Sequence, residues 1–173
     1  MAFPLTIQAT LRVPLPGGAA VTDRLLLAAV RRALADHHAA ADPPGYDGGA
    51  LAFRRPIHHR SKNRTPLADV HRGRVATRVE GGAAVFEYEL SLARVAALLA
   101  AGGLAVYPFF LAPLLGRPVL SPGPVLAGMA IAAVSHALGY ARAARRFPRL
   151  LAEATEDAVR RAAARALAAP PAS

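Results

Sequence analysis

Apolar and polar side chains alternate from the first residues of the chain. Residues 3 to 13 keep this period of two over eleven positions, which is typical of a β-strand with one buried face. A proline- and glycine-rich stretch ends the run at residues 14 to 18. From Thr22 to about Ala40 the apolar positions recur with a helical period instead, and Thr22 and Asp23 suit the N-cap and first turn of a helix. The pattern therefore predicts a strand followed by an amphipathic helix.

Residues 74 to 90 form two further alternating runs separated by Gly81 and Gly82, a strong signal for a β-hairpin with a two-residue turn. The predicted pairs are Glu80–Ala83, Val79–Ala84, Thr77–Phe86, Val75–Tyr88, Arg78–Val85 and Arg74–Glu89, a register that collects the apolar side chains on one face. A short strand is expected at residues 50 to 54, because Pro56 limits its length. The predicted fold class is α+β, with a βαβββ domain in which a helix covers a mainly antiparallel sheet.

The periodicity disappears at Leu92, where a long apolar stretch begins. From Val95 to Leu115 the only ionisable side chain is Tyr107, and about 20 such residues in a helix cross a bilayer core of about 30 Å. A second apolar stretch covers residues 118 to 140. We predict a two-helix transmembrane hairpin, in which Pro108 kinks or breaks the first span.

A last helix is expected from about Arg149 to Ala168, after Phe147 and Pro148. Two acid-before-base pairs at i,i+4 spacing favour it, and its apolar face is narrow: Leu151, Ala154, Ala158 and Ala162. We expect this helix to be solvated or to pack loosely on the first domain. The predicted domains are residues 1–91, a cytoplasmic α+β domain, residues 92–141, the transmembrane hairpin, and residues 142–173, a cytoplasmic C-terminal helix and tail.

The distribution of positive charge predicts the orientation in the membrane. The chain carries a net charge of +10, but the turn between the spans holds only Arg117. The flanks hold Arg74, Arg78, Arg94, Arg142, Arg145, Arg146 and Arg149. By the positive-inside rule both termini face the cytoplasm. The N-terminus lacks the pattern of a signal peptide.

Small residues recur at helical spacing in both predicted spans. They are Ala96, Ala100 and Gly103 in the first span and Gly128, Ala132, Ser135 and Gly139 in the second. Such faces allow close helix packing, either inside the hairpin or between copies of the chain. His136 lies between them, and an ionisable group within a span is a functional candidate. The spans offer it no acidic partner, so we favour a hydrogen bond from His136 to a backbone carbonyl near the headgroups.

The strongest concentration of charge lies between residues 54 and 74. Its basic residues are Arg54, Arg55, Arg60, Lys62, Arg64, Arg72 and Arg74, against the single acid Asp69. The second hairpin strand leads directly into the first span, so Arg72 and Arg74 should lie at the membrane-facing end of the sheet. Basic residues held there attract anionic lipid. A solvated loop that only obeys the positive-inside rule is an equal alternative.

Two other interpretations of the basic segment have less support. His58, His59, His71 and Asp69 are potential metal ligands, but adjacent histidines on an extended segment point in opposite directions, and no catalytic motif accompanies them. A nucleic-acid site usually adds aromatic platforms, and none lies between Phe53 and Phe86. We therefore predict no metal, no cofactor, no nucleic-acid partner and no enzymatic activity.

Together these patterns predict a small integral membrane protein that acts as an anchor or accessory subunit. It would present a basic cytoplasmic domain to anionic lipid or to a partner protein. The alternative is an oligomeric pore or transporter-like unit, suggested by the kinked first span and by the small-residue faces. Two spans cannot enclose a pathway alone, so that alternative requires a homo-oligomer.

Overall fold

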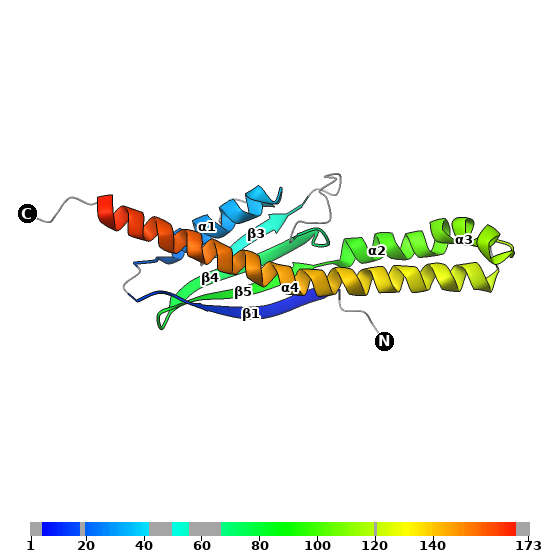
Figure 1. Cartoon of the computed structure of the whole chain (residues 1–173), viewed down its shortest axis with the longest axis horizontal. Coiled ribbons are helices and arrows are strands. Elements are labelled where there is room, and N and C mark those ends of the chain that lie inside the picture. The colour runs from blue at the N-terminus through cyan, green and yellow to red at the C-terminus, as the bar shows by residue number, and fades with distance from the viewer. Residues whose placement is uncertain (1–4, 18–19, 42–49, 56–66, 120, 169–173) are drawn as a thin grey trace, which may run out of the picture.

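The computed structural model describes residues 5–17, 20–41, 50–55, 67–119 and 121–168, and these form an α+β structure with an antiparallel sheet. In chain order the elements are β1 (Thr6–Pro14), α1 (Asp23–Asp36), β2 (Ala40–Ala41), β3 (Ala50–Arg54), β4 (Arg72–Glu80), β5 (Ala83–Ser91), α2 (Ala93–Ala101), the π-helical segment η1 (Gly102–Val106), α3 (Tyr107–Leu115) and α4 (Pro122–Ala168). The molecule is elongated: the sheet and α1 occupy one end, α2 and α3 the other, and α4 runs along both (Figure 1).

The predicted hairpin is confirmed in position and register. Every pair expected between β4 and β5 is present, from Glu80 opposite Ala83 to Arg74 opposite Glu89. Gly81 and Gly82 have φ angles of 56° and 71°, and the absence of a Cβ lets glycine adopt these values without strain. Two positive φ angles give the turn a twist that matches the twist of the paired strands.

The sheet contains one short strand more than predicted. Its order is β1-β5-β4-β3-β2, so the first strand pairs with the last. Helix α1 ends at Asp36 and not at Ala40, because His38 adopts a φ of 59° and turns the chain away from the helix axis. Ala40 and Ala41 then pair with Arg54 and Phe53 as β2.

The start of α1 forms as its sequence predicts. The Thr22 hydroxyl accepts a hydrogen bond from the backbone N–H of Leu25 at 3.3 Å, so Thr22 is the N-cap. The carboxylate of Asp23 accepts a hydrogen bond from the backbone N–H of Val79 at 2.7 Å. Asp23 therefore also ties the first turn of α1 to β4.

The predicted separate C-terminal helix is wrong, because α4 is continuous from Pro122 to Ala168. Pro148 lies inside the helix and does not end it, although a proline removes a backbone donor and crowds the preceding turn. The predicted loose packing is also incorrect. Phe147, Leu150 and Leu151 are completely or almost completely buried, and they join the same core cluster as the sheet and α1. Apolar burial on this scale offsets the local cost of a proline.

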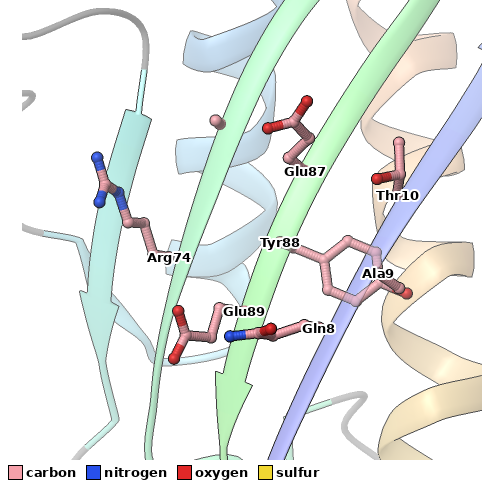
Figure 2. Close-up of a pocket in the computed structure, with 8 residues that line it drawn as sticks. Gln8, Ala9, Thr10, Arg74, Glu87, Tyr88 and Glu89 are labelled. Carbon is pink, nitrogen blue, oxygen red and sulfur yellow. The ribbon is translucent and has the colours of Figure 1, made fainter.

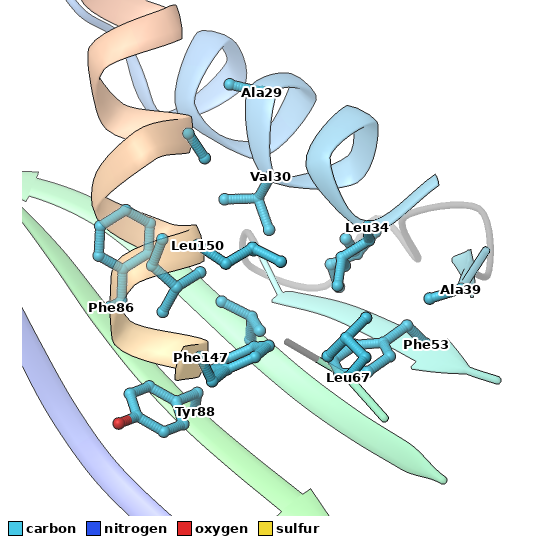
Figure 3. Close-up of a cluster of buried hydrophobic side chains, with 14 of the residues drawn as sticks. Ala29, Val30, Leu34, Ala39, Phe53, Leu67, Phe86, Tyr88, Phe147 and Leu150 are labelled. Atoms are coloured by element: carbon cyan, nitrogen blue, oxygen red, sulfur yellow. The ribbon is translucent and has the colours of Figure 1, made fainter. Parts of the chain in front are cut away.

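The core lies between the sheet and the pair formed by α1 and the second part of α4 (Figure 3). The Phe147 ring stacks on Phe53 with 6.0 Å between ring centroids and lies 5.1 Å from Tyr88. Farther along, Arg32 of α1 and Arg161 both bind Asp157 of α4, at 2.9 and 2.8 Å. The hydrogen bond from Arg161 is the main cause of the lowered pKa of Asp157.

The other end of the molecule is helical, and α2, η1 and α3 pack against the first part of α4 (Figure 1). Pro108 does not break this segment. The preceding turn widens into a π-helix, in which the backbone N–H of Tyr107 donates to the carbonyl of Gly102. Two helices are long and apolar enough to cross a membrane, Ala93–Leu115 and α4, and only 17% and 28% of their apolar windows are buried inside the protein.

Candidate functional site

The sheet has one face that no described helix covers, and this face carries the polar side chains (Figure 2). Its residues form rows across the strands: Thr6, Ser91, Arg72 and Arg54 in the first row, Gln8, Glu89, Arg74 and Ala52 in the second, and Thr10, Glu87, Ala76 and Ala50 in the third. We call these twelve residues the open face. The first row lies beside the start of α2, because Ser91 is separated from Ala93 by one residue.

Two adjoining hollows mark the open face. The larger, of about 570 Å³, lies over the second and third rows between Gln8, Thr10, Arg74 and Glu87. The smaller, of about 270 Å³, lies over the first two rows and is lined by Thr6, Arg54, Arg72 and Ser91 among others. The small side chains of Ala52 and Ala76 leave room for both.

The structure separates the predicted basic residues into three groups. Arg54, Arg72 and Arg74 are exposed on the open face, within the first two rows. Arg55 comes directly after β3 and is only 7% exposed. Arg60, Lys62 and Arg64, together with His58 and His59, lie outside the described residues.

Arg55 has a structural setting. Its guanidinium donates to the carbonyl oxygen of Leu67 at 2.7 Å, and Leu67 belongs to the core cluster. Burial lowers the pKa of Arg55, and the nearby charge of Asp69 opposes this shift. An arginine stays protonated under these conditions, so the positive charge of Arg55 lies near the negative charge of Asp69 in the turn that precedes β4.

Asp69 joins this turn to α4, a role that the sequence pattern did not reveal. Its carboxylate forms an ion pair with Arg142 at 3.3 Å, and its side chain lies against Gly139. A Cβ at Gly139 would lie 3.1 Å from the Asp69 carboxyl carbon, so glycine permits this close approach. The available signal was that Asp69 is the only acid between residues 54 and 74.

We expect Asp69→Asn to lower the free energy of unfolding by about 1–2 kcal/mol, measured by denaturant titration in mild detergent. The substitution removes the ion pair and the charge that faces buried Arg55; breaking a fully buried pair costs more, about 3–5 kcal/mol, but Arg142 is 41% exposed. Asp36→Asn is the matched control, since Asp36 is an exposed acid at the end of α1. An equal loss in both variants would contradict a specific role for Asp69.

The small residues of the two predicted spans occupy different environments. Gly103, Gly128 and Ala132 are buried against one another where η1 meets α4. Gly139 lies on the same side of α4 but contacts Asp69 of the sheet domain. The other predicted packing residues, Ala96, Ala100 and Ser135, are partly exposed.

His136 is 5% exposed and lies on the same face of α4 as Ala132 and Gly139. This position is six residues before Arg142, about 9 Å along the helix axis. His71 contributes its backbone to the end of the sheet: its N–H donates to Ser91 and its carbonyl accepts from Arg55. A chemical role for either imidazole stays a hypothesis.

Comparison with known proteins gives no family for this chain. No protein-family model matches it, and neither the curated proteins nor the solved structures include a significant match.

Proposed function

We propose that the chain is an integral membrane protein that anchors its sheet domain at the inner membrane surface. In this proposal α2 to α3 and the first part of α4 cross the bilayer as a hairpin, with both termini in the cytoplasm. The protein would act as an anchor or accessory subunit that engages anionic lipid or a partner protein. The domain held at the membrane surface consists of the sheet, α1 and the second part of α4.

The distribution of exposed apolar side chains carries this proposal. Among the described residues the large exposed apolar side chains lie almost entirely on α2, η1, α3 and the first part of α4, which we call the helical extension. The exceptions are Leu5 and Leu167. The set comprises Leu98, Leu104, Val106, Phe109, Phe110, Leu114, Leu115, Leu126, Met129, Ile131, Val134 and Leu138. Soluble proteins rarely expose an apolar surface of this extent, whereas a bilayer covers it without cost.

The anchor is joined to the sheet by two continuous connections. Strand β5 leads into α2 through Leu92 alone, and Leu92 is 1% exposed. Helix α4 passes from the helical extension into the core without interruption, and the ion pair of Arg142 with Asp69 lies at the junction. These links support a domain held in a fixed orientation over the membrane, as an anchor requires.

The absence of cysteine from the sequence allows a direct test of insertion and orientation. Single cysteines would be introduced as Pro118→Cys in the turn between the helices and as Thr10→Cys on the open face; both positions are exposed. We expect a membrane-impermeant maleimide to label Pro118→Cys in intact cells and Thr10→Cys only after permeabilisation. The membrane fraction should also retain the protein after washing with alkaline carbonate.

Release of the protein by carbonate would contradict membrane insertion. Labelling of both cysteines in intact cells would contradict a hairpin that separates the turn from the sheet. Labelling of Thr10→Cys alone would keep the insertion and reverse the orientation. The unsubstituted protein is the control for background labelling.

A further inference from the structure

The first row of the open face contains an arrangement of charge that the fold alone does not explain. Arg54 and Arg72 are directly opposite each other on β3 and β4, and Arg74 follows two residues after Arg72 on the same face. Like charges in directly opposed positions destabilise a sheet. An anion bound between them would remove this repulsion.

The three guanidinium groups form no ion pair with another described residue. Glu89 is the cross-strand neighbour of Arg74, but Figure 2 shows the Arg74 guanidinium directed over β3, away from the Glu89 carboxylate. Arg78, on the same strand, differs in this respect. It pairs with Glu80 at 3.3 Å and with Glu87 at 3.1 Å. Arg54, Arg72 and Arg74 therefore place three guanidinium groups without an ion-pair partner among the described residues close together at one end of this face.

That end also provides space and hydroxyl groups. The hollow of about 270 Å³ is lined by Arg54, Arg72 and Arg74, by the hydroxyl-bearing Thr6 and Ser91, and by one acid, Glu89. The three guanidinium groups outnumber this carboxylate, so the lining is positive overall. Guanidinium groups bind phosphate oxygens with paired hydrogen bonds, and hydroxyls suit the polar part of a phosphate ester. The chemistry of the hollow thus fits a phosphate that carries a small polar substituent.

The position of the hollow next to the apolar helices indicates that the phosphate belongs to a lipid and not to a soluble compound. Ser91 is two residues before the first residue of α2, and Arg94 and Arg142 are the charges nearest the apolar surface on α2 and α4. If these helices are in a bilayer, the hollow lies at the depth of the headgroups, where anionic lipid is concentrated. A soluble phosphate compound has no comparable enrichment at this place.

We infer that Arg54, Arg72 and Arg74 bind the phosphate of an anionic phospholipid headgroup on the open face of the sheet. The inference depends on the proposed membrane insertion and adds a defined lipid site to it. The pairing of β3 with β4 places Arg54 beside Arg72 and Arg74, so the site exists only when these two strands are paired.

The test measures lipid binding by the full chain, purified in a non-ionic detergent, by native mass spectrometry during titration with phosphatidylglycerol. Phosphatidylcholine with the same acyl chains reports binding to the apolar helices alone. Each basic residue near an anionic surface contributes about a fivefold factor in affinity, so Arg72→Gln with Arg74→Gln should weaken phosphatidylglycerol binding by about 25-fold. Arg78→Gln with Arg160→Gln makes the same change in net charge and should alter binding less than twofold.

Three results would overturn the lipid site. One is an equal loss in the control double variant, which would mean diffuse attraction by the net charge. Another is equal binding of phosphatidylcholine and phosphatidylglycerol. The last is saturable binding of inorganic phosphate that requires Arg72 and Arg74, without a preference for anionic lipid, which would assign the hollow to a soluble compound.

Thermal unfolding keeps the test valid if the double variant is altered in stability. Phosphatidylglycerol should raise the unfolding temperature of the wild type more than phosphatidylcholine does, and this difference should disappear in the double variant. Arg54→Gln provides the same test from β3. Carbonate extraction separates the two proposals. If the protein stays in membranes but does not prefer phosphatidylglycerol, the lipid site is contradicted and membrane anchoring is not.

Discussion

Phe147→Ala is expected to lower the free energy of unfolding by about 3–5 kcal/mol, measured by denaturant titration in mild detergent. Replacing a buried phenylalanine by alanine loses the favourable free energy of moving the ring out of water. It also leaves a cavity that the surrounding side chains fill only in part. The Phe147 ring is completely buried between Phe53 and Tyr88. The substitution therefore tests whether the second part of α4 belongs to the core of the sheet domain.

Phe110→Ala is the matched control for this prediction. Phe110 is 71% exposed on α3 and has the same side chain, so its removal should change the stability by less than about 1 kcal/mol. Similar losses in both variants would mean that Phe147 does not connect α4 to the sheet. The outcome also bears on function, since Phe147 is five residues beyond Arg142 and fixes the helix to the sheet close to the proposed membrane surface.

The same residues explain why the sequence pattern misplaced the end of the second apolar helix. Pro148 is a strong local signal for a helix boundary, because proline lacks a backbone donor and crowds the preceding turn. The residue before Pro148, Phe147, contacts residues that are distant in sequence: Phe53 of β3 and Tyr88 of β5. A local pattern does not contain these contacts, and they outweigh the effect of the proline.

Local patterns were sufficient where the determining interactions are themselves local. Alternation on both sides of Gly81 and Gly82 fixed the β4–β5 register correctly, because a shift by one residue would turn the apolar side chains to the open face. The cap at Thr22 was predictable for the same reason. The short strand β2 was missed because its two residues carry no periodicity and form a strand only by pairing with β3.

The candidate site was predicted in composition and not in geometry. The excess of arginine between residues 54 and 74 is visible in the sequence, and so is the proximity of Arg72 and Arg74 to the apolar stretch. Exposed Arg54 and buried Arg55 are neighbours in sequence at the end of β3, but the position of Arg54 directly opposite Arg72 requires the β3–β4 pairing. That pairing joins strands separated by a long connection, which a single sequence does not specify.

Gly128→Leu is expected to separate α4 from η1 and to lower the free energy of unfolding by more than the 1–3 kcal/mol typical of overpacking. A Cβ at Gly128 would overlap the carbonyl oxygen of Gly103, and a Cβ at Gly103 would lie 3.0 Å from the carbonyl oxygen of Gly128. Both obstacles are backbone atoms, which cannot move without displacing a helix. Gly128→Ala should produce a smaller loss of about 1–3 kcal/mol.

Gly102→Ala is the control for close packing, because its Cβ would meet only the Tyr107 ring at 3.8 Å. It should be neutral or stabilise the protein by up to about 1 kcal/mol through helix propensity. Thermal unfolding in detergent and crosslinked mass would be measured together. A Gly128→Leu protein of unchanged stability that fell from an oligomer to a monomer would assign this glycine to a contact between copies, as the pore alternative requires. Loss of stability at constant mass would instead show that the Gly103–Gly128 contact holds the two apolar helices of one chain together. An anchor requires such a contact within the chain, because the sheet keeps one orientation only if the helices stay packed.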